Sequence, residues 1–366
     1  MIYLDNAATT EPYDEVVEVV AKKMKDFYNP SALYAKGVEE YRKRIERMLG
    51  VREGHIYFTS GGTESNNWVM RGVKGHVVTD AIEHHSVLRS AMNRPDEILW
   101  RGNGEAVSVG GVTVVGVNEL GMVSVDDVVN AIRDDTVLVS IMMVNNVVGT
   151  VQKIKEIVKA VKAVRSDILV HTDAVQAVGK IKVDVEDLGV DFLSASAHKF
   201  HGPKGIGFLY CRGDIESWMK GGGQEMGKRA GTENVPGIAG MCKALEISCG
   251  RCVELIGIWK QLVEGMWSIE DGMLVGGLER IAGNVYWVFK NVSGEALVME
   301  LMERGYACSI GSACDNGSLE GNYVLKAMGY GDEWNEGGLR ITFDEEFDVE
   351  EFLGALKDSL KELRGY

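Results

Sequence analysis

Proline and cysteine are both scarce in this chain of 366 residues, which contains five prolines and six cysteines. So few cysteines in a chain of this length argue against a disulfide-stabilised secreted domain. No apolar run approaches the roughly 20 residues that a membrane-spanning helix needs, and the chain opens Met-Ile-Tyr-Leu-Asp without a basic leader or a long apolar region. We therefore expect a cytoplasmic protein that does not contact a membrane.

Positive charge is also in deficit. Lys and Arg number 39 against 54 Asp and Glu, which gives a formal net charge of −15. No basic stripe stands out in the sequence, and this argues against nucleic acid as a partner. With 45% hydrophobic and 25% charged residues, the chain can build a large core, and its length favours two domains over one.

What the sequence does contain is an alternation of apolar strands with amphipathic helices, which predicts a mostly parallel α/β sheet. Predicted strands cover 55–60, 77–79, 136–144 and 168–172, and a further strand ends just before Lys199. Ligands of such sheets gather at the carboxyl ends of the strands. The residues that follow predicted strands and could contact a ligand are Gly62, Thr63, His84, Asn146, Asp173 and Lys199.

The segment 191–205, Asp-Phe-Leu-Ser-Ala-Ser-Ala-His-Lys-Phe-His-Gly-Pro-Lys-Gly, organises the rest of the chain. A lysine held at a strand end in a partly dry pocket can be made nucleophilic toward an aldehyde. Pyridoxal phosphate is the common aldehyde cofactor, and it needs a Schiff-base lysine, an acid at its pyridine nitrogen and a phosphate cradle. Lys199 is the candidate lysine and Asp173 the candidate acid, although Asp173 alone also fits a helix cap or a core-paired carboxylate.

A glycine turn supplies the candidate cradle. Gly61-Gly62-Thr63 joins the strand 55–60 to a predicted helix, and such a junction directs backbone N–H groups and the helix dipole at an anion. The Gly-Lys-Ser/Thr ending of a P-loop is missing. Taken alone, the turn is equally consistent with an ordinary tight turn.

Two histidines, His84 and His85, stand together after the strand 77–79. Paired histidines at a strand end suggest a metal site or an acid–base role. Because no third ligand has metal-like spacing, we expect no metal, and stacking of His84 on a cofactor ring is the favoured interpretation.

Three of the six cysteines are candidates for chemistry. Cys249 and Cys252 form a lone C-x-x-C, for which a redox or metal pair and plain packing of a helix both stay open. Cys314 lies among glycine, serine and asparagine residues. That composition favours an exposed, mobile loop in which a thiol is reactive, whereas a loop cysteine without a function is the alternative.

Together these motifs resemble the cysteine desulfurases of the NifS/IscS type, within the class V aminotransferase family of fold-type-I pyridoxal phosphate enzymes. The resemblance covers nearly the whole chain, and Gly-Ser-Ala-Cys at 311–314 is the part that separates desulfurases from other members. It implies a large cofactor-binding α/β domain at 12–250. A smaller α/β domain, formed by 1–11 and 251–366, would carry the cysteine loop at about 308–320. The motifs that carry the resemblance are Tyr3–Thr10, Asn29–Ser31, Phe58–Ser65, Glu83-His84, Val144–Asn146, Asp173–Gln176, Ser196–Lys199, Gly202–Gly205, Gly221–Glu225, Arg229–Thr232 and Gly311–Cys314.

The resemblance also implies residue roles. Lys199 would form the Schiff base with pyridoxal 5'-phosphate, Asp173 would hold the pyridinium nitrogen, and His84 would stack on the ring and handle protons. Cys314 would accept sulfur, and Arg340 would clamp the substrate carboxylate, a task that suits a bidentate guanidinium. The remaining expected contacts are Asn146 and Gln176 to the ring oxygen, Asn146 also to the substrate, Gly62, Thr63, Ser196 and His198 to the phosphate, and Thr232 to the phosphate of the other subunit in a homodimer.

The implied reaction removes sulfur from L-cysteine, leaving L-alanine and a persulfide on Cys314. An iron–sulfur scaffold or another sulfur acceptor would then take the sulfur. A selenocysteine lyase or another class V enzyme is one alternative, and a non-catalytic docking platform for a scaffold is another. The sequence departs from the family pattern at Tyr34, at Val147 and in Ile-Thr-Phe-Asp after Arg340. The departures at Tyr34 and after Arg340 concern the surroundings of the substrate.

Overall fold

The computed structural model describes residues 1–26, 37–92, 108–109, 111–249, 255–311 and 322–365. Within these residues the dominant feature is an eight-stranded sheet with the strand order β2-β9-β8-β7-β6-β3-β5-β4. Its strands are β2 (His55–Thr59), β3 (His76–Asp80), β4 (Ser108–Val109), β5 (Val112–Val115), β6 (Thr136–Ser140), β7 (Leu169–Asp173), β8 (Phe192–Ser196) and β9 (Gly207–Cys211).

The sheet is mostly parallel, as the sequence predicts. The pairs β3–β5, β3–β6, β6–β7 and β7–β8 are parallel, whereas β9 runs antiparallel to both β8 and β2. Strand β2 therefore points the same way as β8, and its carboxyl end opens on the same edge. The reversal at β9 follows from the short link 197–206, because a parallel neighbour would require a long crossover connection.

Helices cover this sheet because their apolar residues recur at helical spacing. In α6, the buried residues Ile154, Ile157, Val158 and Val161 share one face, while Lys155 and Lys159 are exposed. No helix among the described residues combines the length and apolar character needed to cross a bilayer. The helices of this part of the chain are α1 (Asp14–Lys23), α2 (Gly37–Met48), α3 (Gly62–Gly72), α4 (His85–Met92), α5 (Val125–Asn130), α6 (Ile154–Val164), α7 (Val185–Leu188) and α8 (Val235–Ser248).

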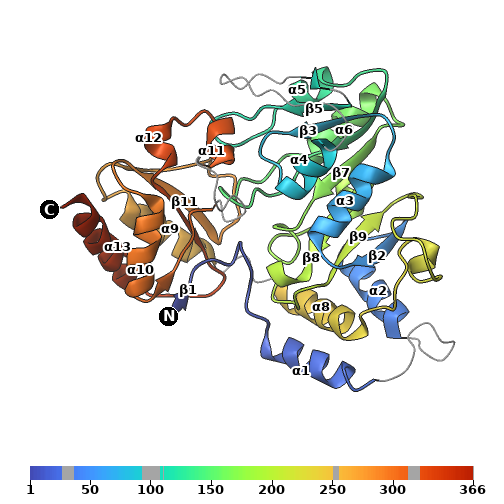
Figure 1. The fold of residues 1–366 in the computed structure, drawn as a ribbon, viewed down its shortest axis with the longest axis horizontal. Helices are drawn as coiled ribbons and strands as arrows, with labels where there is room; N and C mark the ends of the chain where they lie inside the picture. The colour runs from blue at the N-terminus through green and yellow to red at the C-terminus, as the bar shows by residue number, and fades with distance from the viewer. Residues whose placement is uncertain (27–36, 93–107, 110, 250–254, 312–321, 366) are drawn as a thin grey trace.

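A second, smaller unit forms the other lobe in Figure 1. Its three-stranded antiparallel sheet contains β10 (Gly272–Leu274), β11 (Asn284–Phe289) and β13 (Gly338–Thr342). The amino-terminal β1 (Ile2–Tyr3) joins this lobe by pairing with β12 (Tyr306–Ala307). The division into domains at residues 11 and 250 stays a prediction. The helices of the lobe are α9 (Leu255–Met266), α10 (Gly294–Glu303), α11 (Tyr323–Ala327), α12 (Asp332–Asn335) and α13 (Val349–Arg364).

A fully buried histidine in β7 makes the stability of the fold sensitive to acid. The ring nitrogens of His171 lie 2.8 Å from Ser140 Oγ and 3.0 Å from Ser194 Oγ. Burial lowers the pKa of His171 to about 3, so the folded protein keeps the imidazole neutral, whereas the unfolded chain binds a proton near pH 6.5. Below that pH the unfolded state holds more protons, and the free energy of unfolding falls as the pH falls.

We expect the variant His171→Gln to lose this contribution. The free energy of unfolding of the wild type, minus that of the variant, should shrink by up to about 1.4 kcal/mol per pH unit between about pH 6 and pH 4. Denaturant unfolding of both proteins across this range measures the difference, and it cancels the titration of other groups. A difference that does not change with pH would contradict the prediction.

Candidate active site

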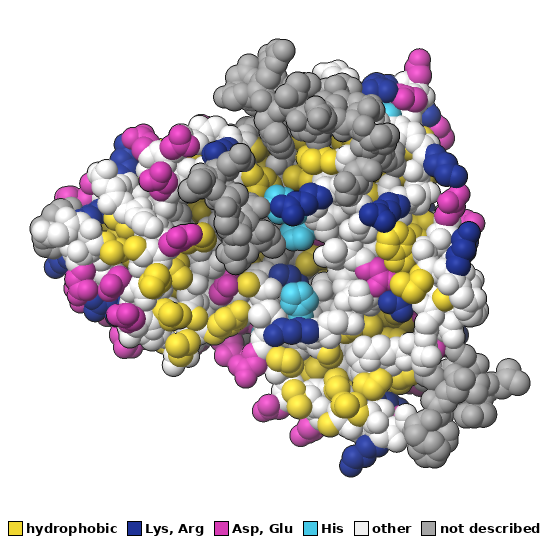
Figure 2. All heavy atoms as spheres, in the orientation of Figure 1, with side chains coloured by type: hydrophobic (Ala, Val, Ile, Leu, Met, Phe, Trp, Pro, Cys, Tyr) yellow, Lys and Arg dark blue, Asp and Glu magenta, His cyan; other side chains and the backbone are white. Residues whose placement is uncertain are grey.

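A cleft opens where the carboxyl ends of the parallel strands meet the smaller lobe, and Figure 2 shows His, Lys and Arg side chains gathered in this hollow. Its cavity measures about 420 Å³. Most of its lining residues follow β2, β3, β6, β7 or β8, while Arg340 comes from β13, Tyr323 from α11, and Ala7 and Ala8 from the amino-terminal segment. Of the predicted site residues, the cavity brings together Gly62, Thr63, His84, Asn146, Asp173, Gln176, Ser196, His198, Lys199 and Arg340.

Lys199 ends a single 3₁₀ turn, Ala197–Lys199, that follows β8 directly. Its Nζ donates hydrogen bonds to the carbonyl oxygens of Ala7 and Ala8, each at 2.7 Å. Gln176 Nε2 donates to the same Ala7 oxygen at 2.8 Å. The amino-terminal segment therefore crosses the cleft and orients the amine, a contact that the strand pattern alone did not predict.

Asp173 is the last residue of β7 and is 4% exposed. One carboxylate oxygen accepts from the Val175 N–H at 2.9 Å, which is the local turn contact expected under the capping interpretation. The other accepts from Asn66 Nδ2 at 2.6 Å and leads into a hydrogen-bonded chain. Asn66 Nδ2 also donates to Ser86 Oγ at 2.8 Å, and Ser86 Oγ lies 2.7 Å from His84 Nδ1. Burial lowers the pKa of His84, so this chain joins a carboxylate to a neutral imidazole.

A second cavity of about 450 Å³ adjoins the first and lies at the amino terminus of α3. Thr63, Ser196 and His198 line both cavities. A side chain at Gly62 would place its Cβ only 2.5 Å from Val175 Cγ2, so the backbone here must lie close to its neighbour. Burial and the nearby Lys199 lower the pKa of His198 to about 4. The junction has the features expected of an anion cradle.

Two fully buried acids lie beside this site, and the sequence analysis assigned neither a role, although Glu83 belongs to the Glu83-His84 motif. Asp80 ends β3, and neither carboxyl oxygen of Glu83 has a hydrogen-bond partner among the residues that the structure describes. Burial raises the pKa of Asp80 to about 7 and that of Glu83 well above its usual value, and the charge of Asp173 raises both further. Both acids next to Asp173 are therefore less ionised near neutral pH than ordinary carboxyl groups, which reduces their repulsion of the Asp173 carboxylate.

The cleft contains buried polar atoms that lack partners. Asn146 Oδ1 and Arg340 Nε both have none within the described residues, and both side chains line the cavity. Buried polar groups of this kind are normally satisfied, so a polar ligand with an anionic group suits the site. Pyridoxal 5'-phosphate fits these residues, because an amine at Lys199, a carboxylate at Asp173 and an anion cradle at Thr63 are present in one connected cleft.

Of the predicted site residues that the structure describes, Thr232 does not line this cleft: it is exposed and lines neither cavity. Cys314 lies outside the described residues, as do Tyr34 and Cys252. Gly311, three residues before Cys314, does line the cleft.

Among the described residues there is no group of three or more His, Cys, Asp or Glu side chains that could hold a metal ion.

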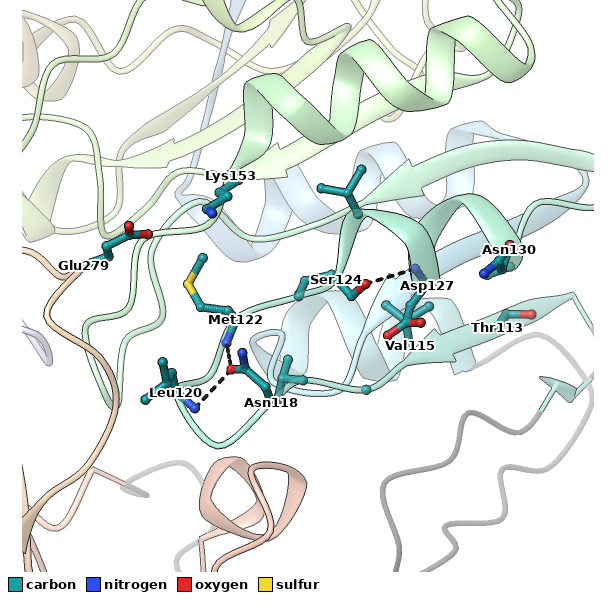
Figure 3. Close-up of a pocket in the computed structure, with 15 residues that line it drawn as sticks. Thr113, Val115, Asn118, Leu120, Met122, Ser124, Asp127, Asn130, Lys153 and Glu279 are labelled. Carbon is teal, nitrogen blue, oxygen red and sulfur yellow. Dashed lines mark hydrogen bonds between the residues drawn. The ribbon is translucent and has the colours of Figure 1, made fainter.

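A larger groove of about 930 Å³ lies between β5, α5 and the turn that joins them, and it contains none of the predicted site residues (Figure 3). Two of its polar side chains, Asn118 and Ser124, serve local turns. Asn118 Oδ1 accepts from the N–H groups of Leu120 and Met122 at 3.0 and 2.9 Å, and Ser124 caps α5 through the Asp127 N–H at 3.3 Å. This groove therefore offers no comparable set of reactive groups.

Comparison with known proteins identifies the family. Residues 2–350 match the family model described as aminotransferase class-V. The chain belongs to the class V aminotransferase family. This confirms the family predicted from the sequence, and with it the mostly parallel α/β fold.

Relatives within this family resemble the chain over nearly its full length. A protein of Methanosarcina thermophila named cysteine desulfurase IscS is 42% identical, and the match covers 99% of this chain and 93% of that protein. A solved structure titled NifS-like protein has a TM-score of 0.86 and 32% identity, with complete coverage of both chains. A structure titled SspA in complex with cysteine has a TM-score of 0.79 and 31% identity, covering 94% of this chain and 99% of that one.

Proposed function

We propose that this class V protein is a pyridoxal phosphate-dependent cysteine desulfurase. It would convert L-cysteine and the thiol of Cys314 into L-alanine and a persulfide on Cys314. One observation carries the proposal: Lys199, Asp173 and Arg340, from separate elements, line a single cleft, in a chain that resembles cysteine desulfurases over nearly its whole length.

When bound, pyridoxal 5'-phosphate supplies an aldehyde that reacts with amines and a ring that withdraws electrons from the substrate. Lys199 would hold the aldehyde carbon, and Asp173 would keep the ring nitrogen protonated. The phosphate would lie at the amino terminus of α3. The other side chains proposed to contact the cofactor are Gly62, Thr63, His84, Asn146, Gln176, Ser196, His198 and, from a second subunit, Thr232.

Side chains of the protein would bind the substrate, move protons and accept the sulfur. Arg340 binds the substrate carboxylate, which orients the amino acid in the cleft. Lys199 Nζ moves the α-proton, and His84, held by Ser86, is a second site for a proton. The Cys314 thiolate forms a bond to the substrate sulfur as the carbon–sulfur bond breaks. The electron pair of that bond stays on carbon, which takes up a proton and gives alanine, so the step needs no external oxidant or reductant.

The position of Thr232 supports the proposal that the protein acts as a homodimer, and two ion pairs fix the loop that contains it. The glycine loop 221–234, which carries Thr232, is fastened by Arg42 to Glu225 at 2.8 Å and by Arg229 to Glu64 at 2.9 Å. The first pair is buried, with 6% and 3% of the side chains exposed. A loop fixed in this way presents Thr232 to the outside, where a second subunit could use it. A cytoplasmic location and delivery of sulfur to an iron–sulfur scaffold or another acceptor complete the proposal.

The test is turnover of L-cysteine by the purified protein in the presence of a thiol reductant. We expect sulfide and alanine in equal amounts. L-selenocysteine and L-cysteine sulfinate are assayed in parallel, because faster turnover of either would favour the selenocysteine lyase or another class V activity. A protein without cofactor absorbance that turns over none of the three amino acids would overturn the proposal, and it would favour a docking role if that protein still binds a scaffold.

A further inference from the structure

The guanidinium of Arg340 already has an anionic partner inside the protein. Arg340 lies in β13 and is only 3% exposed. Its Nη2 donates to Asp5 Oδ1 at 2.6 Å, and its Nη1 donates to the Asn146 carbonyl oxygen at 2.9 Å. Within the described part of the chain the Nε atom has no hydrogen-bond partner. The cation that lines the substrate side of the cleft is therefore neutralised by Asp5 and keeps a free donor.

Asp5 is held in place without the help of Arg340. The backbone of residues 4–6 pairs with β13, through Thr342 N to the Leu4 oxygen at 2.8 Å and Asn6 N to the Thr342 oxygen at 3.1 Å. The Asp5 carbonyl oxygen accepts from Tyr3 Oη at 3.0 Å. These contacts fix the main chain of the acid, so its carboxylate would remain beside Arg340 when a ligand enters.

We propose that Asp5 is an internal counter-ion that sets, and weakens, the affinity of Arg340 for the carboxylate of the substrate and of the product. The proposal rests on the proposed function, in which Arg340 binds that carboxylate. A guanidinium has five N–H donors and can serve two carboxylates at once. The two anions then repel each other across an arginine that is only 3% exposed, where charges interact more strongly than in bulk water. The physical consequence is that alanine binds weakly and leaves readily.

The variant Asp5→Asn removes the negative charge at residue 5 while keeping a side chain of the same shape beside Arg340. Asparagine keeps an oxygen that accepts from Nη2 and has nearly the same volume, but it carries no charge. With the cofactor-loaded protein, we expect the Kd of L-alanine to fall by about three- to thirtyfold, measured by titration calorimetry and by the change in cofactor absorbance. L-alaninamide, which lacks the carboxylate, should bind both proteins equally.

Three further variants control the experiment. Asp5→Glu retains the charge and should keep the wild-type Kd, whereas Asp5→Ser provides a second neutral side chain if the asparagine variant does not fold. Asp344→Asn removes one negative charge from a neighbouring acid that contacts Asn6 at 2.5 Å and pairs with His201. Among the described residues Arg340 bonds to Asp5 and Asn146 and not to Asp344, so the Kd of L-alanine should change less than about twofold.

The outcomes distinguish this inference from the proposed function. If the wild type binds L-alanine and the neutral variants bind it no more tightly, the role of Asp5 is overturned while the desulfurase proposal stands. If tightening appears equally for L-alaninamide, the effect does not act through the carboxylate and the inference is also overturned. A wild type that binds neither L-alanine nor L-cysteine overturns both proposals.

Discussion

Replacing Lys199 by alanine is expected to abolish the cofactor absorbance band at about 420 nm and to slow L-cysteine turnover about a thousandfold or more. The reason is positional. Lys199 is fixed at the end of β8, and its Nζ is oriented by the carbonyl oxygens of Ala7 and Ala8. Excess cofactor does not replace the amine that the variant lacks at the end of β8. Adding it should therefore not restore L-cysteine turnover.

The absorption spectrum and the rate of alanine formation are measured on the same preparation of Lys199→Ala. A matched control is Lys182→Ala, since Lys182 is an exposed lysine in the same part of the chain and lines none of the cavities described above. The control should keep both the band and the activity. An unchanged band in Lys199→Ala would show that the cofactor is held in another way.

Replacing Cys314 by alanine is expected to reduce sulfide release by at least about a hundredfold while leaving the absorbance band intact. Only a thiolate can attack the substrate sulfur, and this requires an accessible thiol. The Gly-Ser-Ala-Cys motif begins at Gly311, which lines the cleft. The prediction for Cys314 itself rests on the sequence and the family resemblance.

Cys308 provides the matched control for this experiment. It is buried, and burial raises the pKa of its thiol, so the thiolate is not formed near neutral pH. Cys308→Ala should lose about 1–2 kcal/mol of folding free energy but retain sulfide release. Sulfide release by Cys314→Ala at the wild-type rate would reject Cys314 as the sulfur acceptor, whatever the result for Cys308.

The carboxyl-end rule for parallel sheets accounts for most of the site that could be predicted. Thr63, His84, Asp173 and Lys199 each follow a strand in the sequence, and they line one cleft because parallel strands end on one edge.

The prediction of β6 was less accurate. The apolar run 136–144 predicted a strand throughout, whereas β6 ends at Ser140, since an apolar run reports burial and not the hydrogen bonding of a sheet.

Asn66 and Ser86 were missed as partners of the site. Each is a small polar residue in the first or second turn of a helix, a position that equally suits local capping. Their role becomes visible only because α3 and α4 lie side by side, which brings Asn66 within reach of both Asp173 and Ser86. Asp5 was also missed, because it lies 335 residues from Arg340 in the sequence.

The sequence alone determined the family, the mostly parallel α/β fold and the reactive side chains expected at the strand ends. These follow from local features: hydrophobic period, turn chemistry and short motifs, which are all readable within a few residues. Only the tertiary structure decided how the amino-terminal segment crosses between Lys199 and Arg340, and that Asp5 neutralises the arginine. Such contacts join segments that are distant in sequence, so they depend on how the two lobes pack and leave no periodic signal in the chain.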